Sequence, residues 1–115
     1  MVSINERIKD VRGTIGFTQS KFAERIAIST SYLGEIELNV KVANERVIRL
    51  IVAEFNVNES WLRTGEGDMF SQDVDAHVAK IISLFKSLDQ QFQLFVLNQL
   101  EGIVEFHKLL KDNEK

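Results

Sequence analysis

The sequence contains no cysteine, no proline and no long apolar run. Without cysteine the chain can form no disulfide, no thiolate nucleophile and no cysteine-ligated zinc site. No apolar stretch approaches the roughly 20 residues that a membrane-spanning helix needs. The N-terminal MVSINERIKD also lacks the apolar core of a signal peptide. We therefore expect no contact with membranes and a cytoplasmic location.

The net charge is small and negative, −3 over 115 residues. A protein that coats nucleic acid through bulk charge would be strongly basic, so this composition argues against that class. The first 53 residues differ from the rest, because they carry eight basic and six acidic side chains. Any attraction for nucleic acid must therefore be local. The length suits one domain, or one small domain with an appendage.

Apolar residues recur every three or four positions along most of the chain, which predicts helices throughout. No strand pattern or internal repeat is present, so the expected fold class is all-α. Ser3 and Glu6 have the spacing of a capping box, and a second capping box, Ser87 to Gln90, marks the start of the last helix. The expected helices cover about 3–16, 18–26, 30–38, 44–55, 58–63, 75–85 and 88–111, with a linker at 71–74.

The second and third expected helices are separated by only about three residues. Two helices joined so closely must cross steeply, which is the geometry of a helix-turn-helix. The second of the pair carries small polar side chains where a buried helix would carry leucines. Side chains of this kind fit between the base edges and phosphates of a DNA major groove. The residues concerned are Thr30, Ser31, Tyr32, Gly34 and Glu35.

The stretch TQSKFAERIAISTSYLGEIE, together with Arg12, Gly16 and NVNESWLRTGEGDMF, resembles the lambda repressor and Cro-type helix-turn-helix family, also called the xenobiotic-response-element family. The resemblance covers residues 3–70. It implies a five-helix DNA-binding domain over residues 1–70, followed by a helical hairpin over residues 71–115. The ending WLRTGEGDMF is similar to phage-derived regulators of Gram-positive bacteria.

The resemblance also implies roles for single residues. Gln19 is expected to contact a phosphate and to brace the third helix. The positions of Thr30, Ser31 and Glu35 read bases, and Tyr32 contacts the DNA backbone or a flanking base. Arg12 and Glu37 are expected to form an internal ion pair. The other candidates for DNA contact are Gly34 and Lys41, with Arg46, which either binds phosphate or keeps the fourth helix soluble.

Two positions depart from the family pattern. The turn residue that is usually glycine is Ala27, and a left-handed alanine costs about 1 kcal/mol relative to glycine. The connection after the third helix usually carries Gly-Lys or Gly-Arg in this family, and here it reads Asn39-Val40-Lys41. Asn39 can end that helix, because asparagine tolerates the left-handed region.

The last helix is more apolar than a single hairpin requires, which predicts dimerisation, since helical bundles of this kind commonly associate. The alternative is packing against the chain's own DNA-binding domain. In the fourth helix, Val47 and Leu50 lie off the main apolar stripe, which implies a second buried face against the tail or a partner subunit. The expected dimer residues are Phe92, Phe95, Val96, Leu100, Ile103, Val104, Phe106 and Leu110.

Residues that could support catalysis or metal binding are sparse. His77 and His107 lie 30 positions apart without a further ligand set, so we expect no metal, no cofactor and no enzymatic activity. The predicted function is a transcriptional repressor that binds double-stranded operator DNA as a homodimer. The alternative is a protein-interaction module, antitoxin-like or anti-repressor-binding, whose last two helices capture a protein partner.

Overall fold

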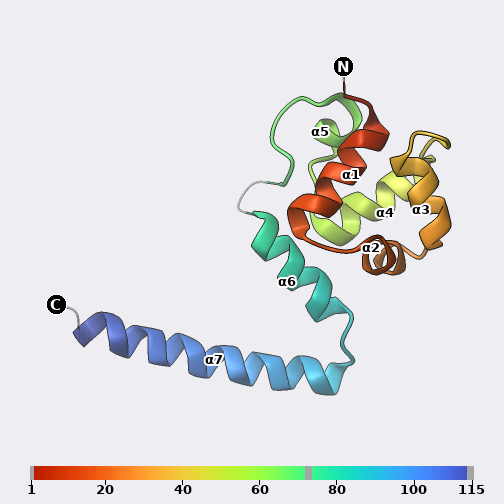
Figure 1. Cartoon of the computed structure of the whole chain (residues 1–115). Coiled ribbons are helices and arrows are strands. Elements are labelled where there is room, and N and C mark those ends of the chain that lie inside the picture. Colours follow the sequence, from red (N-terminus) through yellow and green to blue (C-terminus); the bar gives the residue numbers. More distant parts are fainter. Residues whose placement is uncertain (1, 72–73, 114–115) are drawn as a thin grey trace. The chain divides into compact units, whose positions relative to one another are not determined.

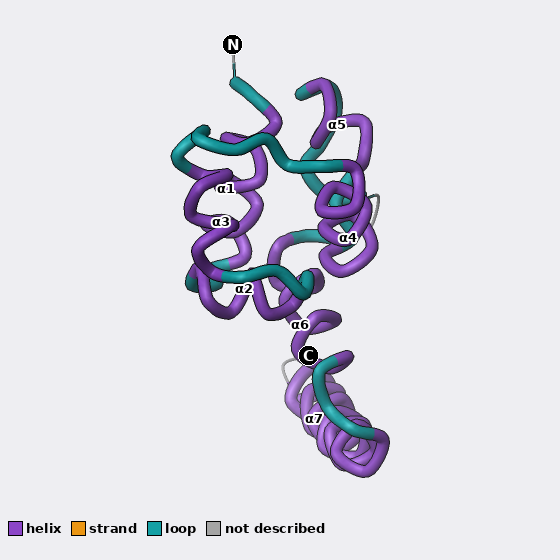
Figure 2. Tube along the Cα trace, turned by 90° about the vertical axis from the view of Figure 1, so that its right-hand side faces the viewer, coloured by secondary structure: helices purple, strands orange, loops and turns teal. Residues whose placement is uncertain are grey.

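A computed structural model describes residues 2–71 and 74–113 of the chain. Within these residues the fold is all-α, as the sequence predicts, with one isolated β-bridge between Val57 and Phe70. Figures 1 and 2 show α1 to α5 gathered around a common centre. The helices are α1 (Ile4–Ile15), α2 (Gln19–Arg25), α3 (Thr30–Glu37), α4 (Glu45–Phe55), α5 (Glu59–Thr64), α6 (Ala76–Lys86) and α7 (Gln90–Asn113).

Local capping signals explain most of the helix boundaries. The Ser3 side chain accepts a hydrogen bond from the Glu6 backbone N–H, and Thr18 accepts one from Lys21. Gly16 ends α1 with a φ of 88°. Asn39, just beyond α3, has a φ of 62°, so its predicted left-handed conformation is confirmed. These interactions span at most four residues, which is why the sequence alone could predict them.

The prediction that Ser87 caps the last helix is wrong. The Asp89 carboxylate accepts a hydrogen bond from the Phe92 backbone N–H, 3.1 Å away, so α7 begins at Gln90. The Ser87 hydroxyl instead donates to the Leu84 carbonyl and closes the end of α6. A carboxylate is a strong acceptor that is favoured at the positive end of a helix, and here it takes the cap from the serine.

The core of the helical domain is built mainly from apolar side chains of α1 to α5 and the segments between them, with Ala79 added by α6. The rings of Phe22 and Phe55 are stacked with centroids 4.7 Å apart, and Phe17 meets Phe55 edge to face at 6.1 Å. Val47 lies in this core, and Leu50 is partly buried against it. This core also contains Ala79 of α6, so the second apolar face of α4 is packed within a core to which the tail helix α6 contributes.

The chain divides into two compact units after Ser83. Most of α6 therefore belongs to the first unit, although the sequence placed it in a C-terminal hairpin. Ala79 and Ser83 are fully buried there. The expected linker at 71–74 lies partly outside the described residues. In the second unit, none of the described residues of α7 is buried.

Candidate nucleic-acid interface

The turn between α2 and α3 is tight and partly strained. Ala27 has a φ of 58°, so it adopts the left-handed conformation that glycine tolerates better than alanine. The Ala27 N–H donates to the Glu24 carbonyl at 3.2 Å, and the Ile28 N–H to the Ala23 carbonyl at 3.0 Å. Ala23, Ile26 and Leu33 are buried beside the turn. The crossing angle of α2 and α3 is thus set by the burial of Ala23, Ile26 and Leu33 in the core and by backbone hydrogen bonds within the turn.

The N-terminal end of α3 presents small polar side chains to solvent. Ser29 is the cap, and its hydroxyl accepts a hydrogen bond from the Tyr32 N–H at 3.0 Å. Thr30 and Ser31 follow and are exposed. Tyr32 is half-buried, and its hydroxyl lies 3.5 Å from the Val42 carbonyl. Thr30 and Ser31 are therefore the side chains of this first turn that are available to base edges.

A charged network holds α1, α2 and α3 together. Arg12 forms two hydrogen bonds with Glu37, from Nε to Oε2 at 2.6 Å and from Nη2 to Oε1 at 2.9 Å. Its third donor, Nη1, reaches the Phe17 carbonyl at 3.0 Å. Gln19 Nε2 donates to Glu37 Oε1 at 3.0 Å. One carboxylate at the end of α3 therefore receives donors from both other helices.

The Glu37 carboxyl is nearly buried, with its side chain 3% exposed. Burial raises the pKa of this carboxyl, but hydrogen bonds from Arg12 and Gln19 and the nearby positive charge lower it by more. The net effect is a pKa below the usual value, so Glu37 is ionised at neutral pH. The hydrogen bonds that Arg12 donates to Glu37, with the negative charge of that carboxylate, raise the pKa of Arg12.

Gln19 and Gly34 meet where α2 faces α3. A Cβ atom on Gly34 would lie 3.9 Å from the Gln19 Oε1, an ordinary van der Waals contact. The Gln19 amide nitrogen is engaged by Glu37, as described above. The bracing role of Gln19 therefore has a structural basis, whereas its expected phosphate contact remains a prediction.

Glu35 and Lys41 form an ion pair at the other end of α3, with Oε2 and Nζ 3.3 Å apart. The Glu35 carbonyl also accepts hydrogen bonds from the Val40 and Lys41 N–H groups, at 2.8 and 3.2 Å. Both side chains are partly exposed, so the pair is accessible to a ligand. Lys41 offsets the negative charge that would otherwise repel a phosphate from this end of α3.

Two buried polar residues of α1 were missed by the sequence analysis. Asn5 Nδ2 donates to the Asn39 side chain and to the Lys41 carbonyl, at 3.0 and 2.8 Å, which holds the loop after α3. Arg7 donates to the carbonyls of Val2, Leu62 and Arg63. The only signal was their position beside Ile8 on the inner side of an amphipathic helix.

The loop that Asn5 holds also exposes apolar side chains. Leu38, Val40 and Val42 are all largely exposed, immediately after α3. Arg46 is exposed on α4, which follows this loop. The candidate interface therefore consists of the start of α3, the Glu35–Lys41 pair and the loop leading to Arg46.

A metal site or a membrane helix is not found in the part of the chain that the structure describes. No three histidine, aspartate or glutamate side chains gather closely enough there to bind a metal ion. None of the described helices combines the length and the apolarity needed to cross a membrane.

Comparison with known proteins agrees with this geometry. A helix-turn-helix domain family matches residues 5–68. A propionyl-CoA carboxylase regulator from Cereibacter sphaeroides is 31% identical to the chain over 68 residues. The aligned segment is 59% of this chain but only 15% of that relative. No solved structure matches the chain. The chain therefore belongs to the helix-turn-helix domain family of DNA-binding transcriptional regulators.

Proposed function

We propose that the chain is a sequence-specific transcriptional repressor, of the phage-derived type, that binds a palindromic operator as a homodimer. The observation that carries the proposal is the first turn of α3, where Thr30 and Ser31 are exposed beside a cap that fixes the helix start. Repression would follow from occupation of a promoter. Two copies would place their recognition helices in half-sites about 10 bp apart, or a multiple of that distance.

The proposed contacts divide into positioning and reading. Lys41, Arg46 and the amide of Gln19 would face phosphates and set the register of the protein on the duplex. Thr30 and Ser31 would read base edges in the major groove. Glu35 would accept a hydrogen bond from a cytosine N4 amine, while Lys41, 3.3 Å away, reduces its repulsion from the phosphates.

The apolar surface of α7 supports the proposed dimer. Its ten largest exposed apolar side chains are each 44–63% exposed, and all lie between Phe92 and Leu110. A phenylalanine offers roughly 150–250 Å² and the seven aliphatic side chains offer less, so the ten leave on the order of 700–900 Å² of apolar surface in water. Each partner in a typical stable interface buries about 800 Å². The area of α7 is therefore sufficient for an interface with a second copy.

The same surface also favours the second candidate function, a protein-interaction module that captures another protein. The two proposals differ in what happens when α7 is removed. A chain ending after Lys86 keeps the whole of α6. The repressor proposal predicts that this chain retains its base preference as a monomer with much weaker operator affinity. The interaction proposal predicts unchanged affinity for DNA and loss of the protein partner.

The decisive experiment is selection of bound duplexes from a random DNA pool at two salt concentrations. Phosphate contacts weaken steeply with salt, whereas base preference persists. Enrichment of a palindrome at the higher salt supports the proposal. Binding of unselected DNA at low salt alone contradicts it.

Single substitutions then test the reading residues on the selected operator. Ser31→Ala is expected to relax preference at one or two base pairs, at a cost of about 1–3 kcal/mol. Ser60→Ala is the matched control, because Ser60 is also exposed but lies on α5. If Ser31→Ala leaves the preference unchanged at every position, Ser31 is not a reading residue.

A further inference from the structure

The helix α6 buries its small residues Ala79 and Ser83 completely, buries Ile82 and Phe85 in part, and leaves three larger apolar residues exposed. Ala79 and Ser83 are 0% exposed, whereas Val78, Ile81 and Leu84 are 38%, 60% and 39% exposed. A surface helix usually buries its large apolar side chains and exposes polar ones. The outward face of α6, defined by Val78, Ile81 and Leu84, is therefore an exposed apolar surface.

Three different contacts fix the inward side of α6. Ala79 and Ser83 pack without exposure, and the Ser83 hydroxyl donates to Glu54 Oε2 at 2.9 Å. The Lys80 ammonium lies 5.6 Å from the centroid of the Phe17 ring, within the range of a cation–π contact. The outward face of α6 is thus held in a defined orientation on the helix-turn-helix unit.

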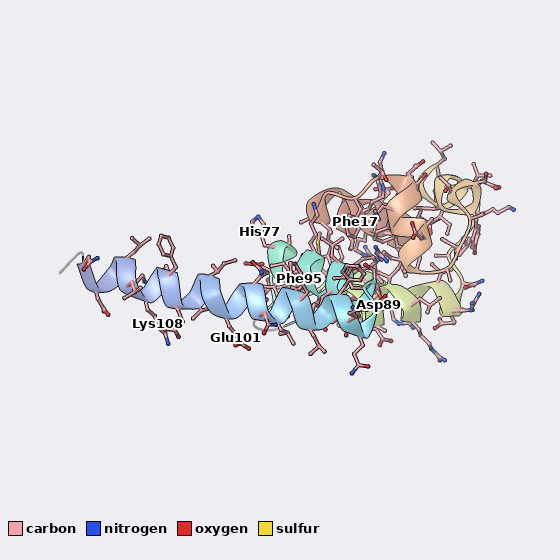
Figure 3. The ribbon with its side chains drawn as sticks, turned by 90° about the horizontal axis from the view of Figure 1, so that it is seen from below. Phe17, His77, Asp89, Phe95, Glu101 and Lys108 are labelled. Atoms are coloured by element: carbon pink, nitrogen blue, oxygen red, sulfur yellow. The ribbon has the colours of Figure 1, made fainter. Side chains whose placement is uncertain are left out.

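The apolar surface of α7 is broader than one partner helix can cover. At about 100° per residue, nine of the ten exposed apolar positions of α7 lie within an arc of about 240°, and only Leu94 lies outside it. The charged residues Glu101, Glu105, Lys108 and Asp112 share a narrow stripe on the remaining side, and Figure 3 shows Glu101 and Lys108 pointing to the same side. A paired helix needs an apolar stripe of only about 100° or less. Full burial of α7 therefore requires at least two neighbouring helices.

We propose that the outward face of α6 is the docking site for α7 of a second copy of this chain. This inference rests on the proposed homodimer. In a twofold dimer, each α7 would meet the partner's α7 on one side and the partner's α6 on the other, which covers both parts of its apolar arc. Because α6 is clamped by Ser83 and Lys80, the same contact would set the distance between the two recognition helices.

The absence of native cysteine allows a direct cross-linking test. One copy carries Ile81→Cys, and a second copy carries a cysteine at Phe95, Leu100, Ile103 or Val104 in turn. Mixed dimers are oxidised and examined on non-reducing gels. We expect a disulfide between chains for at least one of these positions. The matched control, Glu101→Cys on the charged stripe, should give none.

The outcomes separate the inference from the function on which it rests. A dimer by sedimentation that forms no disulfide between chains overturns the inference and leaves the dimer in place. A disulfide that forms only when both cysteines are in one chain shows that α7 folds back onto its own α6, which also overturns it. A chain that is monomeric at every concentration overturns the proposed homodimer itself.

A distance measurement tests whether the contacts of Ser83 and Lys80 fix the orientation of α6. A spin label at Glu24→Cys, an exposed position on α2, reports one distance between the two copies of a dimer. We expect a narrow distance distribution in the otherwise native chain, and a broader one after Ser83→Ala combined with Lys80→Ala. Circular dichroism checks that the variant remains folded. A distribution that is equally narrow in the folded variant removes Ser83 and Lys80 as positioning residues.

Discussion

Removal of Arg12 tests the network that joins the first three helices. In Arg12→Met, Glu37 keeps only the hydrogen bond from Gln19 and loses both donors of the guanidinium. The Glu37 side chain is 3% exposed and that of Arg12 is 19% exposed, so water can hardly solvate the carboxylate once the guanidinium is removed. Breaking a buried ion pair from one side typically costs 3–5 kcal/mol. Because Arg12 is partly accessible to water, we expect Arg12→Met to lower the free energy of unfolding by about 3 kcal/mol, the lower end of this range.

The loss can be measured by urea unfolding followed by circular dichroism. A change of 1 kcal/mol lowers the melting temperature of a small domain by about 4–8 °C, so the effect should also be plain in thermal unfolding. The m-value should stay constant, because the amount of buried surface hardly changes. The double variant Arg12→Met/Glu37→Leu should recover most of the stability, since it leaves no charge unpaired.

Arg63 provides a matched control. Its guanidinium also makes a two-pronged contact, with Glu45 at 2.9 and 2.7 Å, but the pair lies at the surface. Surface ion pairs contribute little to stability, so Arg63→Met should change the urea midpoint much less than Arg12→Met. If Arg12→Met loses less than about 1 kcal/mol, or if the double variant is as unstable as the single one, the burial argument is refuted.

Three further predictions concern stability. The pKa of Glu37 is lower in the folded protein than its value of about 4.3 in the unfolded chain, so ionised Glu37 stabilises the fold above that pH, and this stabilisation is lost as the pH falls through the folded pKa. The urea midpoint should therefore fall in acid, and should fall less steeply in Arg12→Met/Glu37→Leu. Ala27→Gly should raise the stability by about 1 kcal/mol, because φ is 58° at this position; an unchanged or lower melting temperature would contradict this. Arg7→Met should cost about 3 kcal/mol in urea unfolding, because three carbonyls lose a charged donor; a loss under about 1 kcal/mol would show that water replaces it.

The sequence predicted the helices well because their signals are local. Serine, threonine and asparagine caps act over two or three residues, and the glycine at the end of α1 adopts a conformation that few other residues tolerate. The failure at Ser87 is also local: two acceptors lay two positions apart, and the carboxylate of Asp89 took the cap. The spacing in the sequence alone could not show which of the two side chains would cap α7.

The recognition surface was predictable only in part. The exposed side chains of Thr30 and Ser31 follow from their place at the start of a short polar helix. The pairing of Lys41 with Glu35 did not follow, because it depends on how the chain turns after α3. Asn5, 34 residues from Asn39, gave no sign of holding that turn.

The sequence by itself determined the class of this protein: an all-helical chain with a helix-turn-helix and a strongly apolar last helix. Helical periodicity and caps carry that information, since both act within about four residues. Only the tertiary structure decided which polar groups are buried and which way α6 faces. Ala79 and Ser83 turn inward, in place of Val78 and Ile81, because the small residues allow close packing and Ser83 reaches Glu54, 29 positions earlier in the chain. Contacts over such distances depend on the whole fold, and no local pattern encodes them.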